Sequence, residues 1–168
     1  IGKLLPHIET LHALYRALEQ QRHARGAIEF ESGEVEFRLG PSGEVVQAAM
    51  QERNDAHKLI EECMIAANVE AAKFLLKKKI PAPYRVHDKP PESKYAELLE
   101  FLRQFGLRLP AWSEVTPAAY TALLRKVRKR DDAALLESVL LRSQALAVYQ
   151  PENIGHFGLA LEAYAHFT

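Results

Sequence analysis

Residues 54–79 read NDAHKLIEECMIAANVEAAKFLLKKK and predict one long helix. Asn54 is a favoured N-cap residue, and no proline or glycine interrupts the stretch that follows it. Small and apolar residues occupy nearly every face of this helix, which predicts burial on most sides. It is the most distinctive element of the sequence.

Three polar residues interrupt this apolar surface at intervals of seven: Asn54, Glu61 and Asn68. Residues seven apart lie on one stripe of a helix, and His57 lies close to that stripe. A carboxylate on a mostly buried helix is unfavourable unless it is paired or hydrogen-bonded. Glu61 therefore needs a partner. The pattern leaves two alternatives open, which are a ligand hydroxyl and an internal arginine or backbone amide.

Upstream of this helix, apolar residues recur at helical spacing over residues 4–18, and Gly26 is expected to end that helix. Residues 28–30, 35–39 and 45–46 alternate between apolar and polar types and are separated by turn sequences. This period of two predicts a short antiparallel meander.

Phe30 lies in the first expected strand, on the same face as Ile28. A single phenylalanine in a strand is most often a core residue. The alternative is a platform on which a nucleobase stacks, a contact worth roughly 1–3 kcal/mol per base.

Downstream, residues 84–87 predict a brief strand, and residues 95–105 predict an amphipathic helix that Gly106 ends. Thr116 and Pro117 are typical of a helix start. A final apolar helix is expected to follow Asp131-Asp132 and to run to about Leu146. Helices and a small antiparallel sheet are segregated along the chain, so the predicted fold class is α+β, with helices packed around that sheet.

Composition favours one soluble globular domain in the cytoplasm. The chain has 168 residues, 48% of them apolar, and its single cysteine, Cys63, fits a reducing compartment and a place in the core. No apolar run approaches the roughly 18 residues of a membrane span. The net charge of zero argues mildly against nucleic-acid binding. Basic residues do cluster at 77–79 and 125–130, which fits solvated helix ends or an RNA-binding surface.

Candidates for catalysis and metal binding are sparse. The seven histidines show no HExxH-type spacing, and residues 155–158 (GHFG) are too short for a phosphate loop. Two-metal phosphoryl hydrolysis needs several convergent carboxylates. The sequence has four aspartates, at positions 55, 88, 131 and 132, and the last two adjoin a basic helix end that explains them. We therefore expect no catalytic residue and no metal ligand in this chain.

Four stretches, residues 26–39, 52–75, 83–90 and 149–168, resemble the catalytic RNB domain of the ribonuclease II and ribonuclease R family, in the same order and at similar spacing. The resemblance covers nearly the whole chain. The first residue is not methionine and the last residues are apolar and aromatic. We therefore expect residues 1–168 to form an incomplete, C-terminal-central part of that domain, truncated at both ends.

The resemblance implies a parent enzyme that hydrolyses RNA processively from its 3′ end to nucleoside 5′-monophosphates. It implies Mg²⁺ held by aspartates that precede the matched region, and a catalytic arginine that follows it. The implied partner is the 3′ end of single-stranded RNA, and the implied parent is a monomer with flanking RNA-binding domains of the OB type. Without the aspartates and the arginine, this piece is expected to be inactive and to bind no metal.

The resemblance also implies site residues. Glu61 matches a glutamate that contacts a ribose near the cleavage site, and Phe30 matches an aromatic residue that stacks on bases. A motif before the catalytic arginine includes several residues that position its loop or contact RNA. The complete set of expected RNA-binding residues is Glu61, Phe30, Asn54, His156, Phe157, Gly158 and Tyr164.

Two other functions remain as hypotheses. A stand-alone helical interaction module would have a closed core and would melt cooperatively. A metalloprotein that binds its metal through histidines would contain stoichiometric zinc.

Overall fold

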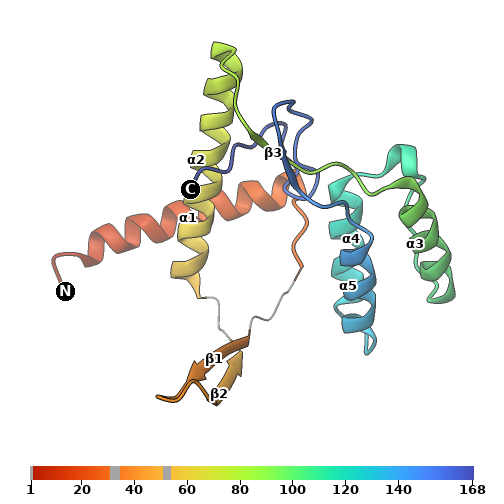
Figure 1. Cartoon of the computed structure of the whole chain (residues 1–168), viewed down its shortest axis with the longest axis horizontal. Helices are drawn as coiled ribbons and strands as arrows, with labels where there is room; N and C mark the ends of the chain where they lie inside the picture. The colour runs from red at the N-terminus through yellow and green to blue at the C-terminus, as the bar shows by residue number, and fades with distance from the viewer. Residues whose placement is uncertain (1, 31–34, 51–53) are drawn as a thin grey trace.

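The computed structural model describes residues 2–30, 35–50 and 54–168, which form two groups of helices joined by short sheets and loops (Figure 1). One helix lies across another in the first group, and three helices stand side by side in the second (Figure 1). The crossing helices are α1 (Leu5–Arg25) and α2 (Asp55–Lys78). The group of three comprises α3 (Glu92–Gln104), α4 (Pro117–Val127) and α5 (Ala133–Arg142), with the 3-10 turn η1 (Trp112–Glu114) before α4.

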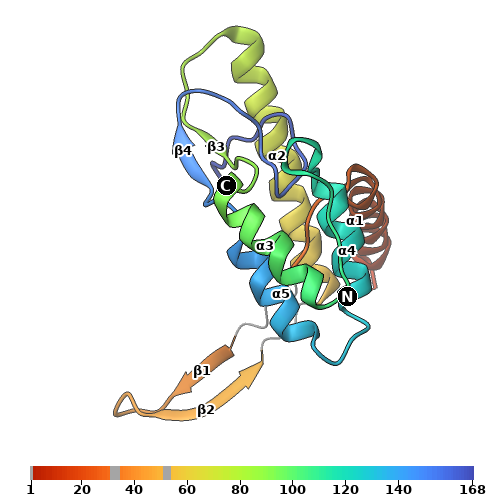
Figure 2. The same ribbon diagram turned by 90° about the vertical axis from the view of Figure 1, so that its right-hand side faces the viewer.

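The strands form two separate antiparallel pairs. Strands β1 (Val35–Leu39) and β2 (Val45–Met50) make a hairpin that stands away from the helices (Figure 2). Strand β3 (Tyr84–Val86), which follows α2, pairs with strand β4 (Val148–Gln150), which follows α5. Helices with small antiparallel sheets confirm the predicted α+β class.

The predicted meander is wrong in its first strand. Residues 27–30 form no strand, and the Ile28 amide donates to the carbonyl of Gly158 at 2.8 Å. The Ile28 side chain is buried in the core of the three-helix group, which draws this segment away from the hairpin. The expected turn at Glu31-Ser32-Gly33 lies outside the described residues.

Helix boundaries agree well with the sequence signals. The Asn54 side chain accepts hydrogen bonds from the amides of the next turn at 3.0 and 3.1 Å, and Thr116 caps α4. Gly26 follows α1 with a left-handed backbone (φ 80°). One boundary is wrong, because α5 ends at Arg142 instead of near Leu146. The Ser143 hydroxyl donates to the carbonyl of Leu140 at 2.7 Å, and Leu146 is 86% exposed.

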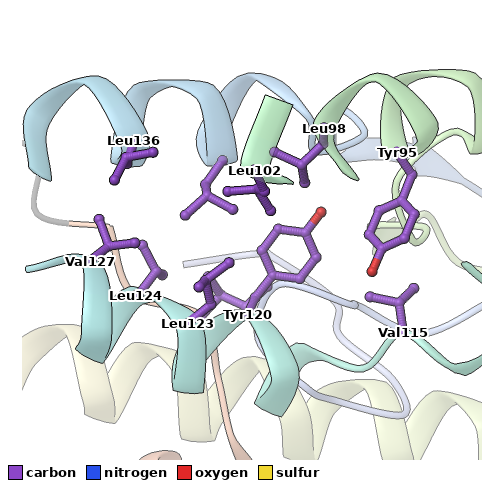
Figure 3. Close-up of a cluster of buried hydrophobic side chains, with 11 residues drawn as sticks. Tyr95, Leu98, Leu102, Val115, Tyr120, Leu123, Leu124, Val127 and Leu136 are labelled. Atoms are coloured by element: carbon purple, nitrogen blue, oxygen red, sulfur yellow. The ribbon is translucent and has the colours of Figure 1, made fainter. Parts of the chain in front are cut away.

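The main core lies inside the three-helix group (Figure 3). Tyrosine and leucine side chains from all three helices point toward one another there, as the apolar spacing of each helix predicts. Five of them have no measurable exposure: Tyr95, Leu102, Tyr120, Leu136 and Leu140. This group gives the remaining elements a rigid support.

The prediction that α2 is buried on most sides is wrong. Its buried residues are Glu62, Ile65, Asn68 and Ala72, all on the side that faces α1 and the C-terminal segment. Ile60 is 60% exposed, and Cys63, expected in the core, is half-buried. Composition misled here because alanine favours a helix whether or not another element covers it. Among the described residues, no helix combines the length and apolarity that crossing a membrane requires.

The C-terminal loop joins four segments around two histidines. The Gly158 amide donates to Nδ1 of His87 at 2.9 Å, so Nε2 of the same ring carries the proton and donates to the carbonyl of Ala145 at 3.0 Å. A Cβ on Gly158 would lie 2.8 Å from that Nδ1, so only glycine fits. The Phe157 ring packs edge-on against His87 and against Tyr120 of the core.

Both histidines of this junction are held in the neutral form. Burial, followed by the nearby His87, lowers the pKa of His156 to about 4, and burial also lowers the pKa of His87. Nδ1 of His156 accepts a hydrogen bond from the amide of Leu159 at 3.1 Å, which requires an unprotonated nitrogen.

The core assignment predicts different costs for two neighbouring leucines of α5. Leu136→Ala leaves a cavity at a fully buried position and should lower the free energy of unfolding by about 2–5 kcal/mol. Leu135 is 51% exposed, so Leu135→Ala should cost about 0.5 kcal/mol or less. Urea unfolding of the two variants measures the difference, and equal costs would contradict the assigned core.

The histidine junction predicts loss of stability in acid. An unfolded histidine binds a proton below about pH 6.5, whereas folded His156 resists protonation down to its own pKa of about 4. Stability is therefore complete above about pH 6.5 and falls by roughly 2 kcal/mol by about pH 4.5 through His156. His156→Asn keeps an acceptor for the Leu159 amide and removes the titration. Thermal melts across this range should show a shallower decline for the variant.

Candidate RNA-contacting site

The site is organised by one arginine in the last turn of α1. The Arg22 side chain is 12% exposed and contacts three carboxylates. Its Nη1 lies 3.1 Å from Glu61 and 2.8 Å from Glu62, both on α2, and its Nε lies 2.8 Å from Glu29. Burial favours loss of the proton, but the carboxylates of Glu62, Glu29 and Glu61 outweigh it and raise the pKa of Arg22. The cluster links three segments of the chain through one cation.

Glu61 and Glu62 are consecutive but occupy different environments. The Glu62 side chain is 6% exposed and depends on Arg22 for its charge balance, whereas the Glu61 side chain is 37% exposed. The internal arginine, one of the two alternatives left open by the sequence, is therefore present. The ion pair does not enclose Glu61, which still faces solvent beside a hollow.

That hollow lies between α2 and the C-terminal segment and measures about 340 Å³. A carboxylate, two imidazoles and one phenol line it together with apolar side chains. Its lining residues are His57, Ile60, Glu61, Met64, Ile65, Leu159, Tyr164 and His166. An acidic acceptor beside apolar walls suits a ligand that presents hydroxyl groups and flat rings.

Phe30, in the segment after α1, does not line the hollow. Its side chain is half-buried against the three-helix core. This degree of burial is intermediate between that of a core residue and that of an open stacking platform. The preceding residue, Glu29, binds Arg22 through its side chain, and its carbonyl accepts from Arg128 Nη2 at 2.6 Å. Arg22 thus connects the Phe30 segment to Glu61.

The polar stripe of α2 divides into three separate tasks. Asn54 is the helix cap and does not line the hollow. Asn68 is fully buried, and its amide nitrogen donates to the hydroxyls of Tyr164 and Thr168 at 3.1 and 2.8 Å. Of the stripe, Glu61 is the residue that lines the hollow.

The other expected RNA-binding residues belong to the junction of the C-terminal loop. His156, Phe157 and Gly158 make the internal contacts described above, and none of them lines the hollow. Tyr164 does line it, next to His166, whose ring stacks on the Tyr164 ring with centroids 5.9 Å apart. The structure therefore brings Glu61 and Tyr164 together and places the loop motif behind them.

Sequence reasoning missed Arg22, Glu62 and His166, whereas His57, predicted to lie close to the polar stripe, does line the hollow beside Glu61. The adjacent acids Glu61 and Glu62 could have indicated a buried ion pair. Neighbouring residues of a helix point in different directions, so the two carboxylates meet different surroundings. Arg22 gave no such signal, since its partners on α2 lie 39 and 40 residues away.

The described residues hold no group of three metal-binding side chains. Asp55 pairs with His12 at 3.1 Å, and Asp132 pairs with Arg130 at 2.7 Å on another element. The basic residues at 77–78 and 125–126 lie in the last turns of α2 and α4, where cations complement the helix dipole. The donor set within the described ranges therefore does not fit a two-metal centre.

Comparison with known proteins places this geometry in a family. Ribonuclease R of Escherichia coli strain K12 is 48% identical over 165 residues, covering 98% of this chain and 20% of that protein. Ribonuclease R of Aquifex aeolicus is 38% identical over 165 residues, covering 98% of this chain and 23% of that protein. The chain thus spans about a fifth of the length of these curated relatives.

Solved structures show the same fold. Mycoplasma genitalium RNase R in complex with double-stranded RNA matches with a TM-score of 0.93 at 24% identity, over 100% of this chain and 30% of that one. The same enzyme with ribose-methylated single-stranded RNA matches with a TM-score of 0.91, over 100% of this chain and 26% of that one. The RNB domain model matches residues 3–168. This chain therefore belongs to the RNB domain family.

Proposed function

We propose that this chain is part of the RNB domain of a Mg²⁺-dependent exoribonuclease that hydrolyses RNA from its 3′ end and releases nucleoside 5′-monophosphates. Within that enzyme it supplies surface that contacts RNA, and it does not supply the metal-binding carboxylates. Similarity to ribonuclease R over 98% of the chain supports the reaction class. Two similar solved structures are complexes of Mycoplasma genitalium RNase R with RNA.

The observation that carries this proposal is a half-exposed glutamate held beside a hollow. A carboxylate accepts hydrogen bonds, and a ribose 2′-hydroxyl is a donor that DNA lacks. Glu61 would accept from that hydroxyl, while Arg22, whose Nη1 lies 3.1 Å away, holds the carboxylate in place. Phe30, fixed through Glu29, would stack on a base, a contact that is independent of the sugar.

Mg²⁺ would be held by carboxylates outside this chain. Two-metal hydrolysis uses convergent acids that hold both ions about 4 Å apart. Asp55 and Asp132, each occupied by its own ion pair, lie on separate elements of the described structure. The described residues would therefore orient the nucleotide, and no chemical step is assigned to them.

A stand-alone interaction module fits the structure less well. Such a module would cover its apolar side chains, yet Leu4 and Ile8 of the first helix region are 60% and 55% exposed. Phe37 of the hairpin is 60% exposed. Surfaces of this kind are typical of a piece that packs against further protein.

The proposed contacts predict two distinguishable losses of affinity. In the full-length enzyme, Glu61→Gln should weaken binding of a single-stranded oligoribonucleotide about tenfold but hardly change binding of a 2′-deoxy strand, because a neutral amide oxygen is a weaker acceptor for the 2′-hydroxyl than a carboxylate. Phe30→Ala should weaken both strands by a similar factor, about tenfold, because stacking ignores the sugar. Fluorescence anisotropy with EDTA, which prevents degradation, measures both.

Glu70→Gln is the matched control for this experiment. Glu70 lies on the same helix and pairs with Lys73 at an exposed position, so its substitution should leave both affinities unchanged. Equal RNA affinity for Glu61→Gln and the unsubstituted enzyme would refute the sugar contact.

The missing carboxylates predict that this chain has no nuclease activity by itself. With Mg²⁺ and a 3′-labelled oligoribonucleotide, residues 1–168 should release no mononucleotide above background, because no two-metal centre forms. The full-length enzyme at the same molar concentration is the positive control. Release of nucleoside 5′-monophosphate by the short chain would show that it carries its own catalytic centre.

A further inference from the structure

Arg22 contacts both segments that carry the proposed RNA contacts. Through Nη1 it binds Glu61 on α2, and through Nε it binds Glu29, the residue before Phe30. Its backbone takes part as well, because its carbonyl accepts from the amide of Ala27 at 3.3 Å. One residue therefore fixes how the chain leaves α1 and where Glu61 lies.

The turn after Arg22 leaves little freedom for this segment. Gly26 has a left-handed backbone, and a Cβ at that position would lie 2.8 Å from the Cβ of Ala118 on α4. The Thr121 hydroxyl donates to the carbonyls of Gly26 and Ala27 at 3.1 and 3.0 Å. The segment from Gly26 to Phe30 is thus held against α4, and its one charged link to α2 among the described contacts is Arg22.

Charge balance explains why Arg22 can hold Glu61 and still leave its carboxylate able to accept further hydrogen bonds. One guanidinium serves three carboxylates, and the buried Glu62 makes the shorter contact, at 2.8 Å against 3.1 Å for Glu61. A carboxylate has about four lone-pair positions, so the contact with Arg22 occupies only part of its acceptor capacity, and the Glu61 side chain stays 37% exposed. The guanidinium is a planar fork that spans several partners, which an ammonium group does not do.

We propose that Arg22 is a positioning residue. It holds the Glu61 carboxylate where a ribose 2′-hydroxyl can donate to it, and it sets the distance between that carboxylate and the Phe30 segment. The proposal rests on the proposed function of Glu61. The Arg22 side chain is 12% exposed, too little for direct contact with RNA. It therefore acts through Glu61 and Glu29.

The test compares binding of an oligoribonucleotide with binding of its 2′-deoxy counterpart in the full-length enzyme, in EDTA. Arg22→Gln should reduce the ratio of the two affinities about tenfold, as Glu61→Gln does. The double variant Arg22→Gln/Glu61→Gln should discriminate no worse than Glu61→Gln alone, because both changes remove one contact. Arg22→Lys keeps the charge without the fork and should retain part of the discrimination.

Two further variants separate positioning from damage to the fold. Arg22→Gln leaves the buried Glu62 without its cation, so Arg22→Gln/Glu62→Gln removes that charge as well and preserves the fold while still releasing Glu61. Arg16→Gln is the matched control, since Arg16 is an exposed arginine of the same helix that pairs with a glutamate, Glu19. It should change neither affinity.

The outcomes separate this inference from the proposed function. Loss of 2′-hydroxyl discrimination in Arg22→Gln/Glu62→Gln, without further loss on adding Glu61→Gln, supports positioning. Discrimination that survives in Arg22→Gln/Glu62→Gln but not in Glu61→Gln overturns the role of Arg22 and leaves the sugar contact intact. Additive losses would show that Arg22 touches RNA directly, which also overturns it. Unchanged discrimination in Glu61→Gln refutes the sugar contact itself.

Discussion

The close approach of Gly158 to the His87 ring is the constraint on which the arrangement of this chain depends. At that point the segment after α1, the end of β3, the segment after α5 and the C-terminal loop meet through hydrogen bonds of 2.7–3.1 Å. The aromatic ring of Phe157 extends the junction into the core of the three-helix group. A second link between the crossing helices and the three-helix group is the segment after α1, which Thr121 and Arg128 hold to α4.

The same junction explains why a conspicuous motif lies behind the hollow. The polar atoms of residues 156–158 form hydrogen bonds within the protein, and burial keeps the His156 imidazole neutral by lowering its pKa. They fix the backbone path of the residues that follow, and this path places Tyr164 and His166 at the hollow. Asn68 completes that path, because its amide oxygen accepts from the amides of Phe167 and Thr168 at 3.1 and 3.4 Å.

Local signals in the sequence were sufficient for the helices and insufficient for the site. Asn54, Thr116 and Gly26 act within one turn of their own position, so their capping roles could be predicted. Phe30 could not be placed, because alternation with glutamates resembles a strand although the segment packs on a helical core. The ion pairs of Arg22 join residues about 40 positions apart, and such contacts leave no periodic trace. The resemblance to a family supplied Glu61, for which the spacing alone left two alternatives.

The division of labour between Glu61 and Glu62 has a consequence for the length of α2. Each added residue rotates the rest of an α-helix by about 100°. The cap, the two acids and Asn68 must therefore keep their relative directions around the axis of α2, because each contacts a different neighbour. Replacements on the open side of the helix leave these directions untouched, whereas one extra or missing residue between the cap and Glu61 would turn the wrong acid toward the hollow. The geometry of α2 is therefore compatible with substitutions on its open side but not with a change in its number of residues.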